Sequence, residues 1–216
     1  MMIFRDANSL KQDYSVFASF YKIIVRDKEI NCRNVCDIKR NNISKSERLD
    51  AYLILMNPGS CHPIDENYTI PKYYDWEHID IDMVECIPDY AQYQVMKLMD
   101  NKKWNYVRIL NLSDIIMGKS KDFIGLLHTI PFNEHSIFSN RRLDNRSQVM
   151  KEEAKIIASW GGNKELKELA ILCKESLQNK DIVGIPYDKE ALRYKYIKPL
   201  LVDQQKKVLE EFITFL

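Results

Sequence analysis

The sequence predicts an α/β protein with one domain over residues 1–216, in which a central, mainly parallel sheet is flanked by helices. Short apolar runs of strand length, rich in β-branched and aromatic residues, alternate along the chain with segments of helical periodicity. Strands that alternate with helices favour a parallel sheet, because each helix carries the chain back across the sheet. Six glycines are spread along the chain and no repeat or flexible linker is visible, which favours a single domain.

Five apolar runs are predicted to be strands. They span residues 20–25, 51–56, 106–112, 155–160 and 181–186, and they read FYKIIV, AYLILM, YVRILNL, KIIASW and DIVGIP. Each is short and bounded by polar, glycine or proline residues, as buried strands of an α/β sheet are.

Three segments are predicted to be helices: residues 89–104, 163–180 and 203–216. In the first, Ala91, Val95, Leu98 and Met99 recur at helical spacing and share one face. The second repeats this pattern with Leu166, Leu169, Ala170, Cys173 and Leu177. These helices would cover the faces of the sheet.

Composition restricts the class of protein. Hydrophobic residues make up 45% and charged residues 29% of the chain, and no apolar run is long enough to cross a bilayer. The first residues carry no apolar segment typical of a signal peptide, so we expect a cytoplasmic protein without membrane contact. Five cysteines, scattered and odd in number, favour reduced thiols over a disulfide framework.

The charge is close to balanced, with a formal net charge of +1, so any nucleic-acid surface must be a local patch. Residues 140–148 and 191–198 are two basic segments, the second interleaved with tyrosines. The interpretation as two solvated faces stays open. Residues 75–89 carry six carboxylates and no lysine or arginine. Candidate contacts to a nucleic-acid backbone are Arg141, Arg142, Arg146, Arg193 and Lys195.

The predicted strands end in polar or glycine-containing turns. In a parallel sheet the carboxyl ends of neighbouring strands meet at one edge, where sites form. We therefore expect Asn57, Asn111 and Lys198 to converge on one pocket. The residues of these turns are Asn57, Pro58, Gly59, Ser60, Asn111, Trp160, Gly161, Lys198 and Pro199.

Asparagine at a strand end suits recognition of a base, because its planar carboxamide offers one acceptor and two donors. It also suits the orientation of a water molecule, but it is no strong general base. Such a pocket would act by positioning and electrostatics. Each residue has an alternative role: Asn57-Pro58-Gly59 as an ordinary turn, Asn111 as a cap, Trp160 as packing and Lys198 as a solvated side chain.

The motifs resemble a bacterial and phage family, the domain-of-unknown-function family sixteen forty-three. That family has Leu-Asn-Pro-Ser-Thr after a strand, then an Asp-x-Thr-Ile-like segment, Asn-Leu-Phe, Trp-Gly and His-Pro-Leu. This chain has, in the same order over residues 50–201, Met56-Asn57-Pro58-Gly59-Ser60, Tyr68-Thr69-Ile70, Asn111-Leu112, Trp160-Gly161 and Lys198-Pro199-Leu200.

A more distant resemblance is to the uracil-DNA glycosylase superfamily, a parallel sheet flanked by helices. LMNPGS (55–60) resembles its Gly-Ile-Asn-Pro-Gly motif, RILN (108–111) its Leu-Leu-Leu-Asn motif, and ASWGG (158–162) its Trp-Gly. The last motif, His-Pro-Ser-Pro, is matched poorly by YIKPLL (196–201), which has no histidine.

The resemblance implies roles for residues. Asn57 would orient the attacking water, Asn111 would bind the Watson–Crick edge of a flipped base, and Lys198 would stand where a histidine supports charge on the departing base. One of Tyr68, Tyr73 and Tyr74 would stack on the base. Pro58, Gly59, Ser60, Trp160, Gly161 and Pro199 would complete the substrate site.

We therefore expect a protein that recognises a flipped or single-stranded nucleobase, with hydrolysis of its N-glycosidic bond as the candidate reaction. The missing histidine favours an alternative, a catalytically inactive base- or nucleotide-binding module. A third hypothesis is an unrelated hydrolase or transferase with a nucleoside-like substrate. The partner is DNA or a nucleoside-like small molecule, the oligomeric state stays open, and no cofactor or metal is expected.

Overall fold

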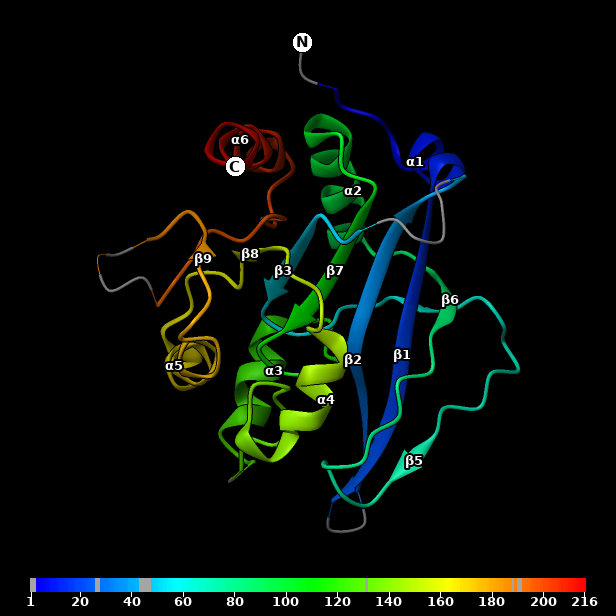
Figure 1. The fold of residues 1–216 in the computed structure, drawn as a ribbon, viewed down its shortest axis with the longest axis vertical. Helices are drawn as coiled ribbons and strands as arrows, with labels where there is room; N and C mark the ends of the chain where they lie inside the picture. The colour runs from blue at the N-terminus through cyan, green and yellow to red at the C-terminus, as the bar shows by residue number, and fades with distance from the viewer. Residues whose placement is uncertain (1–2, 26–27, 43–47, 131, 188, 190–191) are drawn as a thin grey trace.

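A mixed sheet organises the molecule (Figure 1). The computed structural model describes residues 3–25, 28–42, 48–130, 132–187, 189 and 192–216. In this part of the chain the sheet has the order β4-β6-β1-β2-β7-β3-β8-β9, and β5 pairs with β1. The strands are β1 (Tyr14–Val25), β2 (Lys28–Arg40), β3 (Ala51–Leu55), β4 (His62–Pro63), β5 (Lys72–Tyr73), β6 (Val84–Ile87), β7 (Tyr106–Asn111), β8 (Lys155–Ala158) and β9 (Ile182–Val183).

The sheet is not mainly parallel, which corrects the sequence prediction. β7, β3, β8 and β9 form a parallel half. The long hairpin β1–β2 is antiparallel, and β2 pairs antiparallel with β7, which joins the two halves. β2 escaped prediction because its sequence, KEINCRNVCDIKR, is largely polar, although residues 32–38 are all buried. The architecture is a single α/β domain.

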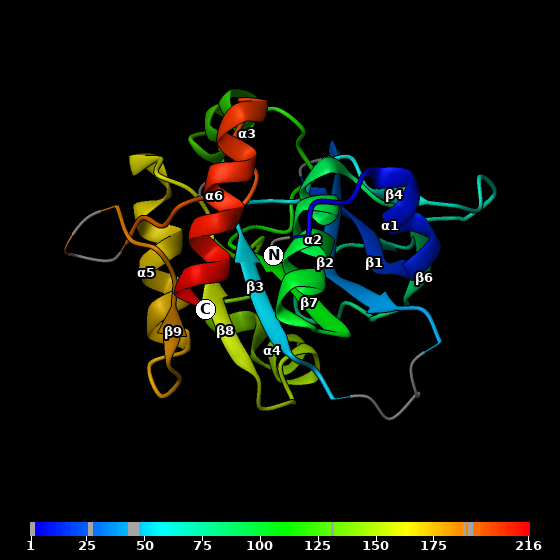
Figure 2. The same ribbon diagram turned by 90° about the horizontal axis from the view of Figure 1, so that it is seen from above.

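Helices cover both faces of the sheet. They are α1 (Ala7–Asp13), α2 (Tyr90–Lys102), α3 (Ser120–Leu127), α4 (Leu143–Val149), α5 (Lys167–Ser176) and α6 (Val202–Phe215). Figure 1 shows α1, α2 and α6 in the upper part of the molecule and α3, α4 and α5 in the lower part, and Figure 2 shows α6 and α2 on either side of β3.

Two apolar cores lie on the two sides of the sheet. Leu10, Met96 and Phe212 carry α1, α2 and α6 onto one core, which also contains Leu53 and Leu55 of β3. The core on the other side contains Tyr52 and Ile54 of β3, with helix residues that include Phe123, Val149 and Leu169. Residues of β3 alternate between the cores because successive strand side chains point to opposite faces. This places β3 at the centre of the fold.

The predicted central strands and the three predicted helices are confirmed, with shifted ends. α2 begins where the capping residue Asp89 accepts hydrogen bonds from Ala91 N and Gln92 N, and Gln92 Oε1 accepts one from Asp89 N. This reciprocal arrangement is a capping box. The second predicted helix begins with a 3₁₀ turn, Lys164–Leu166, before α5.

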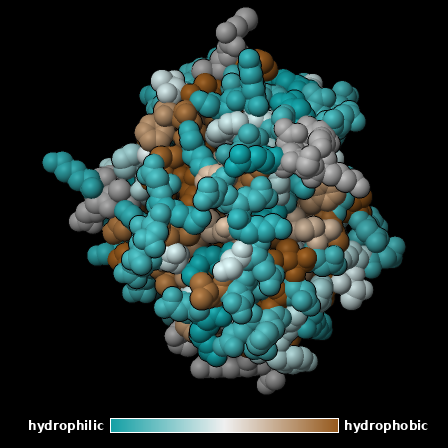
Figure 3. Space-filling model, in the orientation of Figure 1, coloured by the Kyte–Doolittle hydropathy of each residue, from teal (hydrophilic) through white to brown (hydrophobic). Residues whose placement is uncertain are grey.

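The acidic segment 61–90 lies along the outer edge of β1, at the right of Figure 1. It contributes β4, β5 and β6, and β6 pairs antiparallel with β1. The surface in that orientation has hydrophobic side chains scattered among hydrophilic ones (Figure 3). Among the helices in the described part of the chain, none is long and apolar enough to cross a membrane.

Candidate functional site

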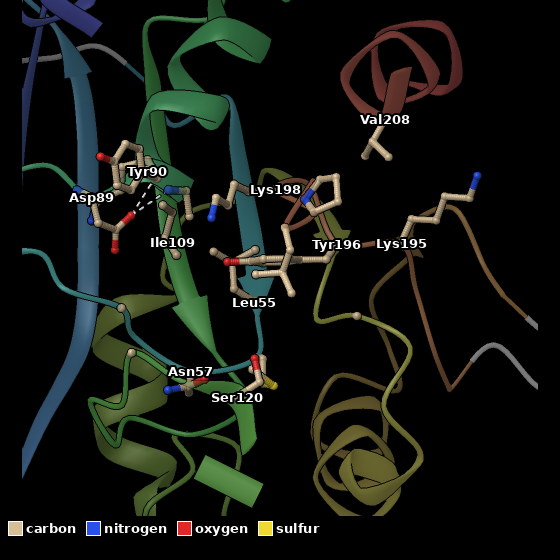
Figure 4. Close-up of a pocket in the computed structure, with 18 of the residues that line it drawn as sticks. Leu55, Asn57, Asp89, Tyr90, Ile109, Ser120, Lys195, Tyr196, Lys198 and Val208 are labelled. Carbon is tan, nitrogen blue, oxygen red and sulfur yellow. Dashed lines mark hydrogen bonds between the residues drawn. The ribbon is translucent and has the colours of Figure 1, made fainter. Parts of the chain in front are cut away.

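A cleft of about 610 Å³ lies at the carboxyl ends of β3 and β8, between α2 and α6 (Figure 4). The parallel strands follow the chain as β3, β7, β8 and β9 but lie in the order β7-β3-β8-β9. The direction of strand addition therefore reverses between β3 and β8, and ligands bind at such reversals in open α/β sheets. The volume is typical of small-molecule sites.

Asn57 lies on the cleft wall directly after β3, as the sequence predicts. Its amide nitrogen lies within hydrogen-bond distance of three carbonyl oxygens: Pro58 O at 3.1 Å, Ile115 O at 3.2 Å and Met117 O at 2.8 Å. These contacts bind the turn 57–60 to the loop after β7 and fix the plane of the carboxamide. The side-chain oxygen is thereby oriented as an acceptor.

Gly59 and Ser60 also line the cleft, whereas Pro58 is buried behind it. Gly59 lies against Asp89, because a Cβ at position 59 would come within 2.7 Å of Asp89 Oδ2. Asp89 caps α2 with its other carboxylate oxygen, Oδ1. The glycine of the Asn-Pro-Gly turn therefore leaves room for a carboxylate at the cleft wall.

The segment after residue 192 forms the opposite wall. Ser159, at the end of β8, accepts a hydrogen bond from Ile197 N at 2.8 Å and donates one to Lys195 O at 2.9 Å. These two hydrogen bonds hold the segment that places Tyr196 and Lys198 in the cleft, with Lys198 directed toward α2 (Figure 4). Lys198 Nζ lies 5.7 Å from the centroid of the Tyr90 ring. Burial raises the pKa of Tyr196, so its hydroxyl remains a hydrogen-bond donor.

Gly161 lines the cleft, but its neighbour Trp160 does not. Gly161 has a φ of +97°, which glycine adopts without the steric cost of a Cβ. Trp160 is buried; its Nε1 donates to Leu192 O at 2.9 Å, and its ring stacks edge-on with Tyr194 at 4.9 Å. Trp160 therefore packs the wall and does not contact a ligand, which corrects its assignment to the substrate site.

Asn111 and the predicted stacking tyrosines lie outside the cleft lining. Asn111 is fully buried at the end of β7, and neither atom of its amide has a hydrogen-bond partner among the described residues. Tyr68, Tyr73 and Tyr74 belong to the edge segment and do not line the cleft. The aromatic residues that line the cleft are Tyr90, Tyr187 and Tyr196.

Two of the predicted backbone contacts are interior residues. Arg142 is 0% exposed and pairs with Asp114 at 2.5 Å. Arg146 is buried and donates to the carbonyls of Ile137 and Ser139. Neither can reach a nucleic-acid backbone, which corrects the sequence interpretation. The reason is that these arginines belong to α4 and the turn before it, which pack on the sheet.

The other basic residues have different surroundings. Arg141 is exposed and forms ion pairs with Glu77 and Glu134. Lys195 pairs with Glu211 at 2.5 Å and points away from Lys198, beside α6 (Figure 4). Pro199 lines the cleft. Of the two predicted patches, only the one around residues 193–198 flanks the cleft.

Arg33 of β2 is a cleft residue that the sequence interpretation missed. It is 2% exposed, and its guanidinium lies beside the Cys61 thiol. Hydrogen bonds from Cys36 and Cys86, together with the charge of Arg33, hold the pKa of Cys61 well below its usual range. All five cysteines are free and buried, and the described residues contain no group of three His, Cys, Asp or Glu placed to hold a metal ion.

Asp89, Tyr196 and Ser159 were also missed. The capping pattern Asp-x-x-Gln at 89–92 was the signal available for Asp89, since it marks a helix start near the strand ends. No local sequence pattern identifies Ser159 or Arg33 as a site residue, because their roles depend on strands that meet only in the folded sheet.

Comparison with known proteins gives little further information. No family model and no curated protein matches the chain. A solved structure, the acylaminoacyl peptidase of Pyrococcus horikoshii, is similar at 14% identity with a TM-score of 0.34. The match covers 97% of this chain and 32% of the peptidase, so the chain spans about a third of that protein.

Proposed function

We propose that this protein recognises a nucleobase in the cleft between α2 and α6, with hydrolysis of its N-glycosidic bond as the reaction. The observation that carries the proposal is the fixed carboxamide of Asn57. Three backbone carbonyls engage its nitrogen, so its oxygen is an acceptor of defined position at the end of β3. A water molecule that donates to this oxygen would be oriented for attack on the sugar carbon.

The reaction in this proposal is a substitution at C1′ of the sugar. The bond from C1′ to the base nitrogen breaks with its electron pair on the base, and the water oxygen bonds to C1′ and loses a proton. The departing base carries developing negative charge until it is protonated. Lys198, a cation in the cleft, supports that charge in the place of the histidine found in the glycosylase motif.

Exposed apolar side chains at the cleft rim support a nucleic-acid substrate. Leu200, which lines the cleft, is 90% exposed, and Leu201 and Val202 follow it with 62% and 76% exposed. Proteins that unstack DNA insert apolar side chains of this kind between bases. The lysine side chains that line the same cleft suit contacts to the phosphate groups of a nucleic acid. We propose a flipped or single-stranded base as the substrate and DNA as the partner.

The finer fold assignment belongs to the same proposal. A parallel half-sheet with its cleft at the strand carboxyl ends is consistent with the resemblance to the uracil-DNA glycosylase superfamily. The asparagine turn after β3, the asparagine that ends β7 and the glycine after β8 follow the order of that family's motifs.

A catalytically inactive base- or nucleotide-binding module is the second candidate. One observation favours it: Lys198 replaces the motif histidine, and its ammonium group lies 5.7 Å from the centre of the Tyr90 ring. A lysine ammonium held over an aromatic face has three donors and no acceptor, so it is suited to binding an acceptor atom of a ligand.

A glycosylase assay tests the proposal. Oligonucleotides with uracil, mismatched thymine, hypoxanthine or modified cytosines, single- and double-stranded, are incubated with protein and cleaved with alkali at abasic sites. Wild type is compared with Asn57→Ala, Lys198→Ala and Asn8→Ala, the last an exposed asparagine of α1 used as the matched control. We expect strand cleavage that Asn57→Ala abolishes and Asn8→Ala preserves.

Thermal unfolding of each variant separates lost chemistry from lost structure. Base binding without cleavage in the wild type would support the binding module. Neither binding nor cleavage on the whole panel, in protein shown to be folded, would refute base recognition.

A further inference from the structure

We propose that the inner end of the cleft binds a phosphate monoester through Arg33, so that the ligand carries a terminal phosphate, as a nucleoside monophosphate does. The inference narrows the proposed function, because a terminal phosphate restricts the ligand of this cleft to a nucleoside monophosphate or a base at the end of a strand. Only the nucleoside part of the ligand rests on the proposed function. Binding of the phosphate part is tested by a separate measurement.

Arg33 is a buried cation that forms no ion pair with a carboxylate among the described residues, although the Cys61 thiol lies beside its guanidinium. It lines the cleft although it is 2% exposed, so it lies at the inner end. Its Nε and Nη1 have no hydrogen-bond partner among the described residues. A buried charge without partners is strongly unfavourable, and here the unpartnered nitrogens belong to a cleft residue that a ligand can reach.

Two other buried arginines, Arg142 and Arg146, and the half-buried Arg108 all have acceptors within the protein. Arg142 binds Asp114 at 2.5 Å, and Arg108 donates to both carboxylate oxygens of Asp37, at 2.7 and 2.8 Å. Arg146 donates to two backbone carbonyls. Each of these has a carboxylate or carbonyl acceptor within the protein. Arg33 alone among these four also lines the cleft.

Further buried polar side chains without hydrogen-bond partners among the described residues lie on the strands next to Arg33. Asn34 and Asn111 lie on the adjacent strands β2 and β7, between the Cys36–Ile109 pair and the Cys32–Ile115 bridge. Both side chains are buried, and neither amide has a hydrogen-bond partner in the described part of the chain. The strand register shifts at this point of the β1–β2 hairpin, next to Ser19, whose hydroxyl also has no hydrogen-bond partner among the residues that the structure describes.

The cleft as a whole favours an anion. Its lining contains four cationic side chains and two carboxylates, and one carboxylate, Glu211, is paired with Lys195. The remaining carboxylate, Asp89, caps α2 and forms no ion pair with Arg33 in the described structure, although its charge acts on Arg33. The Cys61 thiol, whose pKa is held well below its usual range, lies beside Arg33 and offsets part of its charge. The two remaining cationic side chains of the cleft lining are those of Lys198 and Lys207.

A terminal phosphate fits this position better than an internal one. A phosphodiester within a strand continues on both sides, and its chain would have to enter and leave a buried point. A monoester presents three oxygens from one side. Guanidinium groups bind phosphate through charge-assisted hydrogen bonds, and Nε and Nη1 of Arg33, which have no partner among the described residues, supply such donors.

Calorimetric titration tests the inference with inorganic phosphate, nucleoside 5′-monophosphates and the matching nucleosides, at constant ionic strength. We expect nucleotides to bind wild type about tenfold or more tightly than nucleosides, and Arg33→Gln to lose that difference. Lys167→Gln, an exposed lysine of α5 outside the cleft lining, is the control that keeps it. Binding of inorganic phosphate alone, without a gain from the nucleoside, would assign the site to free phosphate.

A second measurement does not depend on a variant. The side-chain ¹⁵Nε resonance of Arg33 should shift on addition of phosphate, while that of Arg142, which is paired internally, should not. Equal affinity for nucleosides and nucleotides, or an unmoved Arg33 resonance at saturating nucleotide, would overturn the inference. Nucleotide binding through Arg33 without cleavage of any glycosidic bond would leave it standing while the proposed hydrolysis fails.

Discussion

Gly59 and Asp89 are in such close contact that a single Cβ at position 59 would lie 2.7 Å from Asp89 Oδ2. One of these residues follows β3, and the other caps α2. The turn after the central strand and the start of the helix thus meet at the cleft wall. A change at residue 59 is therefore transmitted to the helix.

Gly59→Ala should destabilise the protein by about 1 kcal/mol, because the displaced Asp89 side chain loses its cap on α2. Gly125→Ala is the control, since a Cβ there meets nothing within 4 Å and residue 125 lies within α3. That variant should instead gain about 1 kcal/mol from helix propensity. Urea unfolding measures both, and equal effects of the two variants would contradict the contact.

Arg142→Leu should destabilise the protein by about 3–5 kcal/mol, because it leaves Asp114 buried without its partner. Arg141→Leu removes a neighbouring arginine whose ion pairs are exposed, and it should change stability by less than about 1 kcal/mol. Denaturant midpoints compare the two. A small effect at position 142 would mean that water reaches Asp114 in the native state.

Acid should destabilise the protein through His135. Burial lowers the pKa of this histidine to about 4 from an ordinary value of 6.5. Between these values the unfolded chain binds a proton that the folded state does not, so stability present above pH 6.5 falls as pH decreases toward 4. The full loss is about 3 kcal/mol by linkage.

His135→Asn should remove this part of the pH dependence. Burial raises the pKa of Asp114, which acts in the opposite sense, so the difference between wild type and variant isolates the histidine. Urea unfolding at pH 7, 5.5 and 4 gives the slopes. Parallel slopes for the two proteins would show that His135 is protonated in the fold.

Leu200→Ala should weaken binding to double-stranded DNA and leave binding of a mononucleotide unchanged. Leu200 is 90% exposed at the rim, and truncation removes apolar area that only an unstacked duplex covers. Tyr74→Ala, another exposed apolar side chain but on the edge segment, is the control. Fluorescence anisotropy with both ligands measures the effect, and equal losses for both would place Leu200 within the nucleotide site itself.

The sequence was sufficient for the centre of the fold. β3, β7 and β8 can be recognised from short, largely apolar runs, because strands buried on both faces are rich in apolar residues. β2 does not, since Arg33, Asn34 and Asp37 are polar residues buried in its middle. Periodicity cannot reveal such a strand. The antiparallel half of the sheet was therefore missed together with it.

The same limit applied to the site. Asn57 and Lys198 were identified because strand-end turns are visible in sequence, and both line the cleft. Arg142 was assigned to the surface because its neighbours are charged, whereas its partner Asp114 lies 28 residues away. Pairing between distant residues decides whether an arginine is interior, and a single sequence does not contain that pairing.

The cleft draws its lining from residue 33 through residue 211, so it is completed only when nearly the whole chain has folded. Contacts between residues far apart in the sequence form slowly, because the entropy of closing the intervening loop is lost before the contact can stabilise the chain. The hairpin β1–β2 and the strand pair β3–β7 can form without α6, yet the cleft cannot. Recovery of ligand binding during refolding should therefore lag behind recovery of β-structure. For the same reason, a chain cut before α6 would lose one wall of the cleft, together with the buried Leu209 and Phe212 of the core on that face.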